Sequence, residues 1–311
     1  MYLAKKWDEA SRVFEKLIQI ERELAKKDPD KYLALLVEDS ARYGFVLYKL
    51  NRKDEVAQPL LDAVSFLGRY GQEIKTDAYS LRIAQMANNI IGNFLEKIDE
   101  TDPTVDIDET DTEMLIKLAE LQRQIYRNLS LKNPNNQEYI ELLVYSLMML
   151  GDLYQLSNSW DKAVEVAEEA VMTSRRLVEK NPQKYTPELA SSFYMLAEGL
   201  FELGRHEEAL KASEEAVKLY RQLTEDNPDE YLPELAPRLN NLGNRLSDLG
   251  RHEEALEASE EAVRLYRQLA EENPKKYLPD LASSLNNLGV HLSDLGRHEG
   301  ALRATEEAVE L

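Results

Sequence analysis

The residues best suited to chemistry in this chain of 311 residues form an acidic stretch in its first half. Residues 99–113 contain eight carboxylates and no basic side chain. Oxygen-bearing residues fall where a helix-flanked calcium loop places its ligands, at Asp102, Thr104, Asp106, Asp108 and Glu113. Ile107 stands where that loop needs glycine, so the chain cannot easily wrap an ion. The stretch is interpreted as a solvated acidic loop able to dock a basic partner, with a calcium-binding module at 102–113 as the alternative.

The rest of the sequence offers little catalytic chemistry. It contains no cysteine, which excludes disulfides, thiolate metal sites and thiol nucleophiles. His206, His252 and His298 recur at one repeated turn position, where a ring is expected to pack over the turn and meet a neighbouring carboxylate. There is neither a nucleophile–base pair within a repeat nor a GxxxxGK phosphate loop. We therefore expect no enzyme activity, no metal and no cofactor.

Charge and hydropathy narrow the possible partners. The chain has 58 acidic and 38 basic side chains, a formal net charge of −20. Duplex nucleic acid and anionic membranes both attract basic surfaces, so neither is expected as a partner. No apolar run reaches the ~18–20 residues of a membrane span, and residues 1–7 lack a signal-peptide core. The sequence predicts a cytoplasmic protein that binds a protein or peptide.

An internal repeat organises the second half of the chain. Asn-Pro occurs at residues 181, 227 and 273, a spacing of 46 each time, and an earlier copy lies at residue 133. Residues 227–265 align without gaps on residues 273–311 with 28 identities in 39 positions. Self-similarity at a period of 20–50 residues is typical of a solenoid, in which each unit buries its apolar face on its neighbours.

Within one period the apolar residues follow helical spacing. They recur in steps of three and four across Leu235–Leu249 and form one broad face across Ala255–Leu269. Gly250 between these segments is a helix stop, and Asn227-Pro228 ends the preceding helix. Pro233 is expected in the first turn of the next helix, where proline is tolerated. Each repeat is thus predicted to be a pair of antiparallel helices, and the chain to be all-α.

The repeated small and apolar residues resemble the tetratricopeptide repeat family. One copy of the pattern is Leu242-Gly243, Leu246, Gly250, Ala255 and Ala262, and it recurs 46 residues later. The period of 46 residues is longer than the family's usual repeat, and in this it is similar to the repeats of kinesin-light-chain-like arrays and of bacterial and archaeal signalling arrays. The resemblance implies a right-handed α-solenoid, a superhelix of antiparallel helix pairs in which small residues let helices approach closely.

The repeat predicts the domain organisation. Thirteen helices are expected: a leading one near Tyr2–Lys27 and six pairs, or about six repeats. Residues 1–132 hold divergent repeats with the acidic insertion at 99–111, and residues 133–311 hold regular repeats, the last truncated. These segments are expected to form one continuous solenoid. Its open ends predict end-to-end self-association, because an uncapped repeat exposes apolar surface.

The family resemblance implies a concave groove lined by the first helix of each repeat. Carried over by position, the partner-binding residues are Asn240, Asn244, Ser247, Asn286, Ser293, Tyr194, Glu198 and Tyr48. An asparagine amide can both donate to and accept from a peptide backbone. The asparagines can equally form helix–helix hydrogen bonds or be idle copies of a recent duplication, and a tyrosine at helical spacing can belong to the core.

Two functions remain open on the sequence. The first is a non-catalytic scaffold that binds a peptide or protein in the concave groove. The alternative is the sensor or assembly arm of a larger signalling protein whose ATPase or protease domain lies outside this segment, because both ends fall within a repeat.

Overall fold

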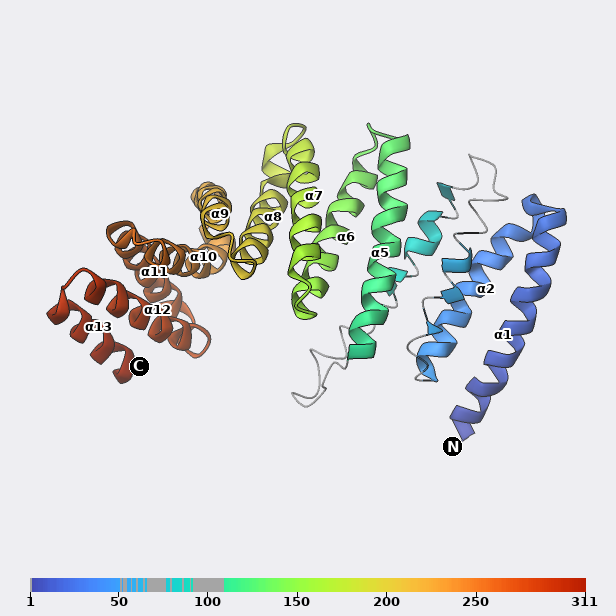
Figure 1. The fold of residues 1–311 in the computed structure, drawn as a ribbon, viewed down its shortest axis with the longest axis horizontal. Helices are drawn as coiled ribbons and strands as arrows, with labels where there is room; N and C mark the ends of the chain where they lie inside the picture. The colour runs from blue at the N-terminus through green and yellow to red at the C-terminus, as the bar shows by residue number, and fades with distance from the viewer. Residues whose placement is uncertain are drawn as a thin grey trace. The chain divides into compact units, whose positions relative to one another are not determined.

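The computed structural model is built from helices in consecutive antiparallel pairs (Figure 1). It describes residues 2–50, 52, 55–56, 58–59, 61–63, 65, 77–78, 80–85, 87–89, 91 and 109–311. These residues contain no β-strand. The all-α prediction and the prediction of thirteen helices in antiparallel pairs are confirmed, and eleven of the helices have bounds within the described residues.

The chain divides into two compact units, residues 1–159 and 160–311. Unit 1 contains α1 (Tyr2–Lys27), α2 (Pro29–Lys49), α5 (Glu109–Lys132) and α6 (Gln137–Leu156). Helix α1 packs on α2, and α5 packs on α6. Fully buried Leu36 and Leu47 on α2 and Leu115 and Leu118 on α5 supply its core, as the helical spacing of these apolar residues requires.

Unit 2 contains seven helices, each packed on the next. They are α7 (Trp160–Val178), α8 (Pro182–Glu202), α9 (His206–Asp226), α10 (Pro228–Asp248), α11 (His252–Glu272), α12 (Pro274–Asp294) and α13 (His298–Glu310). Leu235, Leu239 and Leu285 form its core together with small residues such as Ala255 and Ala262. The small side chains allow the close helix approach that the repeat pattern implied.

The Asn-Pro junctions begin α8, α10 and α12, the first helices of the last three repeats, whereas α6 begins after Asn136. Asn227 ends α9 and caps α10, and Pro228 takes the first helical position, where no intrahelical N–H bond is lost. The Asn181 side chain accepts the Lys184 N–H at 3.2 Å. Helix α10 therefore starts seven residues before the predicted segment at Leu235. The prediction that Pro233 lies in a first turn is wrong: it lies inside α10, because the cap at Asn227 starts the helix earlier.

The predicted glycine stops are confirmed. Gly204, Gly250 and Gly296 have φ of 72°, 72° and 71°. This left-handed conformation is strained for most residues with a Cβ, so glycine follows α8, α10 and α12, and Asn158 takes the same conformation after α6 with φ of 54°.

The outer face of α13 is apolar in part. Leu302 and Val309 are 60% and 82% exposed, whereas Leu256 and Val263, which occupy the same repeat positions on α11, are 5% and 2% exposed. The next repeat covers the α11 face. The end-to-end self-association expected from such a face stays a prediction, as does the division of the chain at residues 132 and 133.

Membrane insertion finds no support in the part of the chain that the structure describes. None of its helices combines the length and the apolar character needed to cross a bilayer.

Candidate functional site

The predicted groove residues of unit 2 lie on α8, α10 and α12, the first helices of three repeats. Asn244, Asn286 and Ser293 are exposed, and Tyr194 and Glu198 are half-buried. All five project from the middle or later turns of their helices. A partner lying across these helices could therefore reach one helix after another.

Glu198 on α8 is the centre of a hydrogen-bond network with α10. Its Oε1 accepts the amide of Asn241 at 3.1 Å and the guanidinium of Arg245 at 2.7 Å. The Asn241 amide also lies 3.5 Å from the Tyr194 hydroxyl. Burial, and next the charge of Glu198, raise the pKa of Tyr194, so its hydroxyl stays protonated as a donor. The network fixes three half-buried polar side chains, Tyr194, Glu198 and Asn241, around the buried Arg245.

Arg245 is the buried member of this network. Its side chain is only 6% exposed. Besides Glu198, its guanidinium donates to Ser213 Oγ on α9 at 2.7 Å and lies 5.4 Å from the Phe201 ring centroid. A buried cation needs such partners, because desolvation of an unpaired charge is costly. Arg245 therefore joins α8, α9 and α10.

Arg238 makes a second set of contacts between the same elements. Its guanidinium lies 4.5 Å from the Tyr194 ring centroid and 5.3 Å from that of Tyr220, and it pairs with Glu234 at 2.9 Å. The Tyr220 hydroxyl lies 2.9 Å from Ser191 Oγ. Stacking on two rings holds Tyr194 in place, so its half-exposed face is pre-organised.

Asn240 and Ser247 face other repeats rather than solvent. Asn240 is 9% exposed, and its Oδ1 accepts the Ser284 hydroxyl of α12 at 2.9 Å. Ser247 donates to Asp294 at 2.9 Å and is half-buried. The sequence left open whether the asparagines form helix–helix hydrogen bonds, and Asn240 does form one. Its neighbour Asn241, which sequence reasoning passed over, lies in the Glu198 network.

The sequence contained a signal for Arg238 and Arg245, the two site residues that the sequence analysis did not predict. Arg245 occupies the place of Gly199 and His291 in the adjacent repeats, and Arg238 that of Ser192 and Ser284. Departures from a nearly exact repeat mark positions with individual contacts. Comparing repeats for differences, rather than for identities, would have pointed to both arginines.

Two of the repeated histidines, His206 and His252, each make one part of the contact predicted from their turn position. The His206 ring packs edge-on against Phe201 with centroids 5.2 Å apart, and His252 Nδ1 lies 3.8 Å from Asp294. His291 differs from them: it is buried, and its Nδ1 lies 2.6 Å from Ser259 Oγ. Burial lowers the pKa of His291. In the described residues, no three His, Asp or Glu side chains gather as a metal site would require.

Tyr48 belongs to unit 1. It is half-buried on α2, and Lys49 Nζ lies 5.6 Å from its ring centroid and 5.1 Å from that of Phe45. Phe45 in turn meets Trp7 edge-on at 6.3 Å. Tyr48 is thus part of an aromatic group with a cation over it, and its use by a partner stays a prediction.

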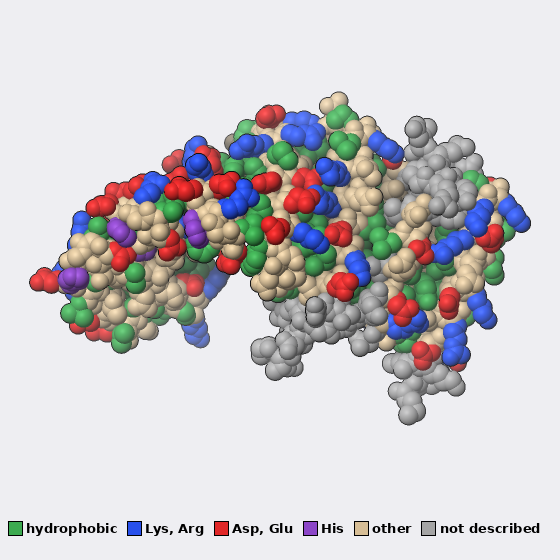
Figure 2. Space-filling model, in the orientation of Figure 1, with side chains coloured by type: hydrophobic (Ala, Val, Ile, Leu, Met, Phe, Trp, Pro, Cys, Tyr) green, Lys and Arg blue, Asp and Glu red, His purple; other side chains and the backbone are tan. Residues whose placement is uncertain are grey.

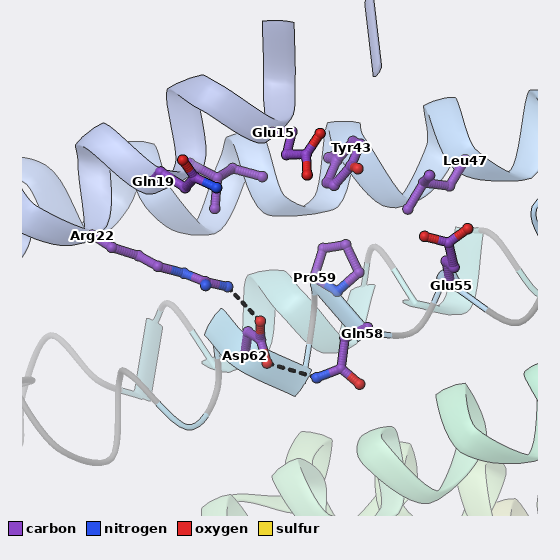
Figure 3. Close-up of a pocket in the computed structure, with 10 residues that line it drawn as sticks. Glu15, Gln19, Arg22, Tyr43, Leu47, Glu55, Gln58, Pro59 and Asp62 are labelled. Atoms are coloured by element: carbon purple, nitrogen blue, oxygen red, sulfur yellow. Dashed lines mark hydrogen bonds and ion pairs between the residues drawn. The ribbon is translucent and has the colours of Figure 1, made fainter. Parts of the chain in front are cut away.

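Unit 1 also contains a cavity of about 380 Å³ between α1, α2 and residues 55–62. Figure 3 shows Arg22 and Gln58 pointing at Asp62, to which they donate at 2.5 and 2.7 Å. Glu55 is held by Arg52 at 2.5 Å. These charges are satisfied within the protein, which gives the cavity a structural rather than a reactive character.

The acidic insertion at 99–111 falls almost wholly outside the described residues, so the calcium alternative at 102–113 stays untested. Over unit 2, acidic and basic side chains are interspersed on the face seen in Figure 2. Such mixing suits a solvated surface, as expected for the glutamate-rich second helices.

Comparison with known proteins supports the repeat assignment. The tetratricopeptide repeat family model matches residues 188–268 and 239–311. The model of anaphase-promoting complex subunit 5 matches residues 123–181. No curated protein sequence matches the chain.

Three solved structures are similar to the chain at low sequence identity. A Podosopora anserina protein assigned to the kinesin light chains, with nearly identical TPR-like repeats, is 17% identical with a TM-score of 0.50, over 73% of this chain and 92% of that chain. BtubC (BKLC) from P. vanneervenii is 17% identical with a TM-score of 0.47, over 98% and 90%. The signal transduction ATPase PH0952 from Pyrococcus horikoshii, with a tetratricopeptide repeat sensor, is 14% identical with a TM-score of 0.49, over 96% and 39%. Residues 188–311, the segment that the family model matches, are tetratricopeptide repeats, and the described helices outside this segment also pack in antiparallel pairs.

Proposed function

We propose that this protein is a non-catalytic interaction scaffold that binds a peptide or protein along the first helices of unit 2. The observation that carries the proposal is the pair of exposed amides at Asn244 on α10 and Asn286 on α12, together with the fixed Tyr194–Glu198 network on α8. Amides can bond a partner backbone, and a rigid tyrosine provides apolar contact at small entropic cost. The site comprises Asn244, Asn286, Ser293, Tyr194 and Glu198, with Asn240 and Ser247 supporting it.

Affinity in such a groove comes from many modest contacts rather than from one deep pocket. The tetratricopeptide fold implies a protein-interaction role. A cytoplasmic location and the alternative role as a sensor or assembly arm of a larger signalling protein stay predictions.

The test is capture of partners from a cell extract by the whole chain, followed by binding measurements with each captured protein. The variant Asn244→Ala/Asn286→Ala is expected to weaken binding at least ten-fold. The control Gln268→Ala/Glu271→Ala removes two equally exposed polar side chains from α11 and is expected to leave binding unchanged. Equal loss in both variants, or no loss in the first, would place binding outside the groove.

A further inference from the structure

Three junctions between repeats share a lysine–tyrosine contact, whereas the junction before α6 has Glu138 ahead of Tyr139. Lys31 lies over the ring of Tyr32 at 4.9 Å, Lys184 over Tyr185 at 4.7 Å, and Lys276 over Tyr277 at 4.8 Å from Nζ to the centroid. Each pair follows a capping Asp or Asn and a Pro at the start of a first helix. An ammonium over an aromatic face is attracted by the ring quadrupole. These three junctions thus supply a cation to their own tyrosine.

The junction at Asn227 breaks this rule. Glu230 stands in the lysine position before Tyr231. No lysine or arginine lies over the Tyr231 ring among the residues that the structure describes. The Asn227 amide instead donates to Glu230 at 2.6 Å.

A cleft of about 540 Å³ lies at this junction, where the start of α8, the end of α9 and the start of α10 meet. Nine residues line it, none of them basic: Pro182, Gln183, Thr186, Gln222, Leu223, Asp226, Asn227, Glu230 and Tyr231. Two of these, Asp226 and Glu230, are carboxylates. Oxygen atoms of Thr186 and of the two glutamines offer further acceptors.

The electrostatics around Tyr231 agree with a missing cation. Burial first, and then contact with Glu230 and the charge of Glu188, raise the pKa of Tyr231 to about 12. In the next repeat the corresponding neighbours of Tyr277 are Lys276 and Glu234, and the Lys276 pKa is raised by Tyr277 and by nearby acidic groups. The same place therefore holds a lysine in one repeat and a glutamate in the other.

We propose that the cleft at Tyr231 binds a lysine side chain of a partner protein. The ammonium would lie over the Tyr231 ring, as in the three sister junctions, with Glu230 and Asp226 as counter-charges. The cleft lies at the first turns of α8 and α10, whereas the groove residues lie in later turns of these helices. The cleft is thus a second contact site, separate from the proposed groove. The proposal for the cleft does not depend on the proposal for the groove.

The first measurement uses the whole chain and two capped tripeptides, acetyl-Ala-Lys-Ala-amide and the same peptide with an Nε-acetylated lysine. Binding is followed at low ionic strength by the NMR signals of the tyrosine rings, with Tyr231 assigned by Tyr231→Phe. Saturable shifts at Tyr231 are expected for the lysine peptide, and binding at least ten-fold weaker for the acetylated one. No saturable shift at Tyr231, or equal binding of both peptides, overturns the proposal.

Exchanging the junction residues sharpens the test. Glu230→Lys restores the sister sequence and is expected to weaken lysine-peptide binding at least ten-fold, because the cleft then contains its own ammonium. Glu225→Lys makes the same charge change on exposed α9 outside the cleft and is expected to weaken it at most about two-fold. Lys276→Glu is expected to create saturable shifts at Tyr277. Equal effects of Glu230→Lys and Glu225→Lys, or no new shifts at Tyr277, contradict a specific lysine site.

Discussion

Arg245 and His291 occupy the same place in successive repeats and solve the same packing problem differently. Arg245 bonds Ser213, and His291 bonds Ser259, the serine 46 residues later. In the preceding repeat the place belongs to Gly199, whose added Cβ would lie 2.9 Å from Val164 Cγ2. Each side chain at this place is therefore matched to its own neighbours, and only Arg245 brings a charge that needs a counter-ion.

The first prediction concerns that counter-ion. Glu198→Ala leaves the Arg245 guanidinium buried without its carboxylate, and it should destabilise the protein by about 3 kcal/mol, the low end for a broken buried pair because Glu198 is partly exposed. Denaturant unfolding measures this loss. In the double variant Glu198→Gln/Arg245→Met no buried charge remains, so most of the stability should return. A double variant as unstable as Glu198→Ala would show that the charge is not the cause.

At the scale of the helices, two kinds of residue set the boundaries. Asn181 and Asn227 cap the first helices of their repeats and are followed by proline at the first helical position. Gly204, Gly250 and Gly296 end those helices with positive φ. Both devices act through the backbone of a few neighbouring residues, which is why the same boundaries recur at α8, α10 and α12, whereas α6 starts after Asn136 and is followed by Asn158 with positive φ.

The second prediction separates two roles of glycine. Gly250→Ala has open space around its new methyl group but places a Cβ at φ 72°, so it should destabilise the protein by about 1 kcal/mol. Gly300→Ala, in the first turn of α13, meets Leu292 only at ordinary contact distance of 3.4 Å and should stabilise by about 0.5 kcal/mol. Thermal unfolding of both variants checks the opposite signs. A stabilising Gly250→Ala would rule out backbone strain as the reason for glycine there.

At the scale of the whole molecule, each unit contains a buried ionisable group that responds to pH. In unit 1, burial and the neighbouring Asp39 raise the pKa of Glu21 from 4.5 to about 7. In unit 2, burial lowers the pKa of His291 below its ordinary 6.5. Between pH 4.5 and about 7, Glu21 therefore keeps a proton in the folded protein that the unfolded chain releases. Just below pH 6.5, His291 stays neutral in the folded protein, whereas the unfolded chain takes up a proton there.

The third prediction follows from these signs. As the pH rises from 4.5 through 7, Glu21 should cost unit 1 stability, and Glu21→Gln should raise the melting temperature more at pH 8 than at pH 5. As the pH falls through 6.5, His291 should cost unit 2 stability, and His291→Gln should flatten that decline. Calorimetry from pH 5 to 8 follows both. A variant that shifts the melting temperature equally at every pH would assign its residue a purely structural role.

The sequence by itself determined the repeat, the helix pairs and most of their boundaries. These features depend on contacts between residues close in sequence: apolar spacing of three and four, asparagine caps, proline at the helix start and glycine at its end. The one boundary error, at Pro233, came from reading a proline as a start signal when the cap lay six residues earlier, at Asn227. The 46-residue period then placed each pair beside the next, and the family pattern named the architecture.

Which polar side chains bond one another and which stay exposed depends on the tertiary structure. Asn240 and Asn241 are adjacent in sequence, yet one bonds Ser284 on α12 and the other Glu198 on α8. Those partners lie more than 40 residues away, on helices that vary between repeats. The cleft at Tyr231 likewise depends on three helix ends meeting in space. Local pattern carries no information about such distant neighbours, because the free energy of a buried polar group depends on what packs against it.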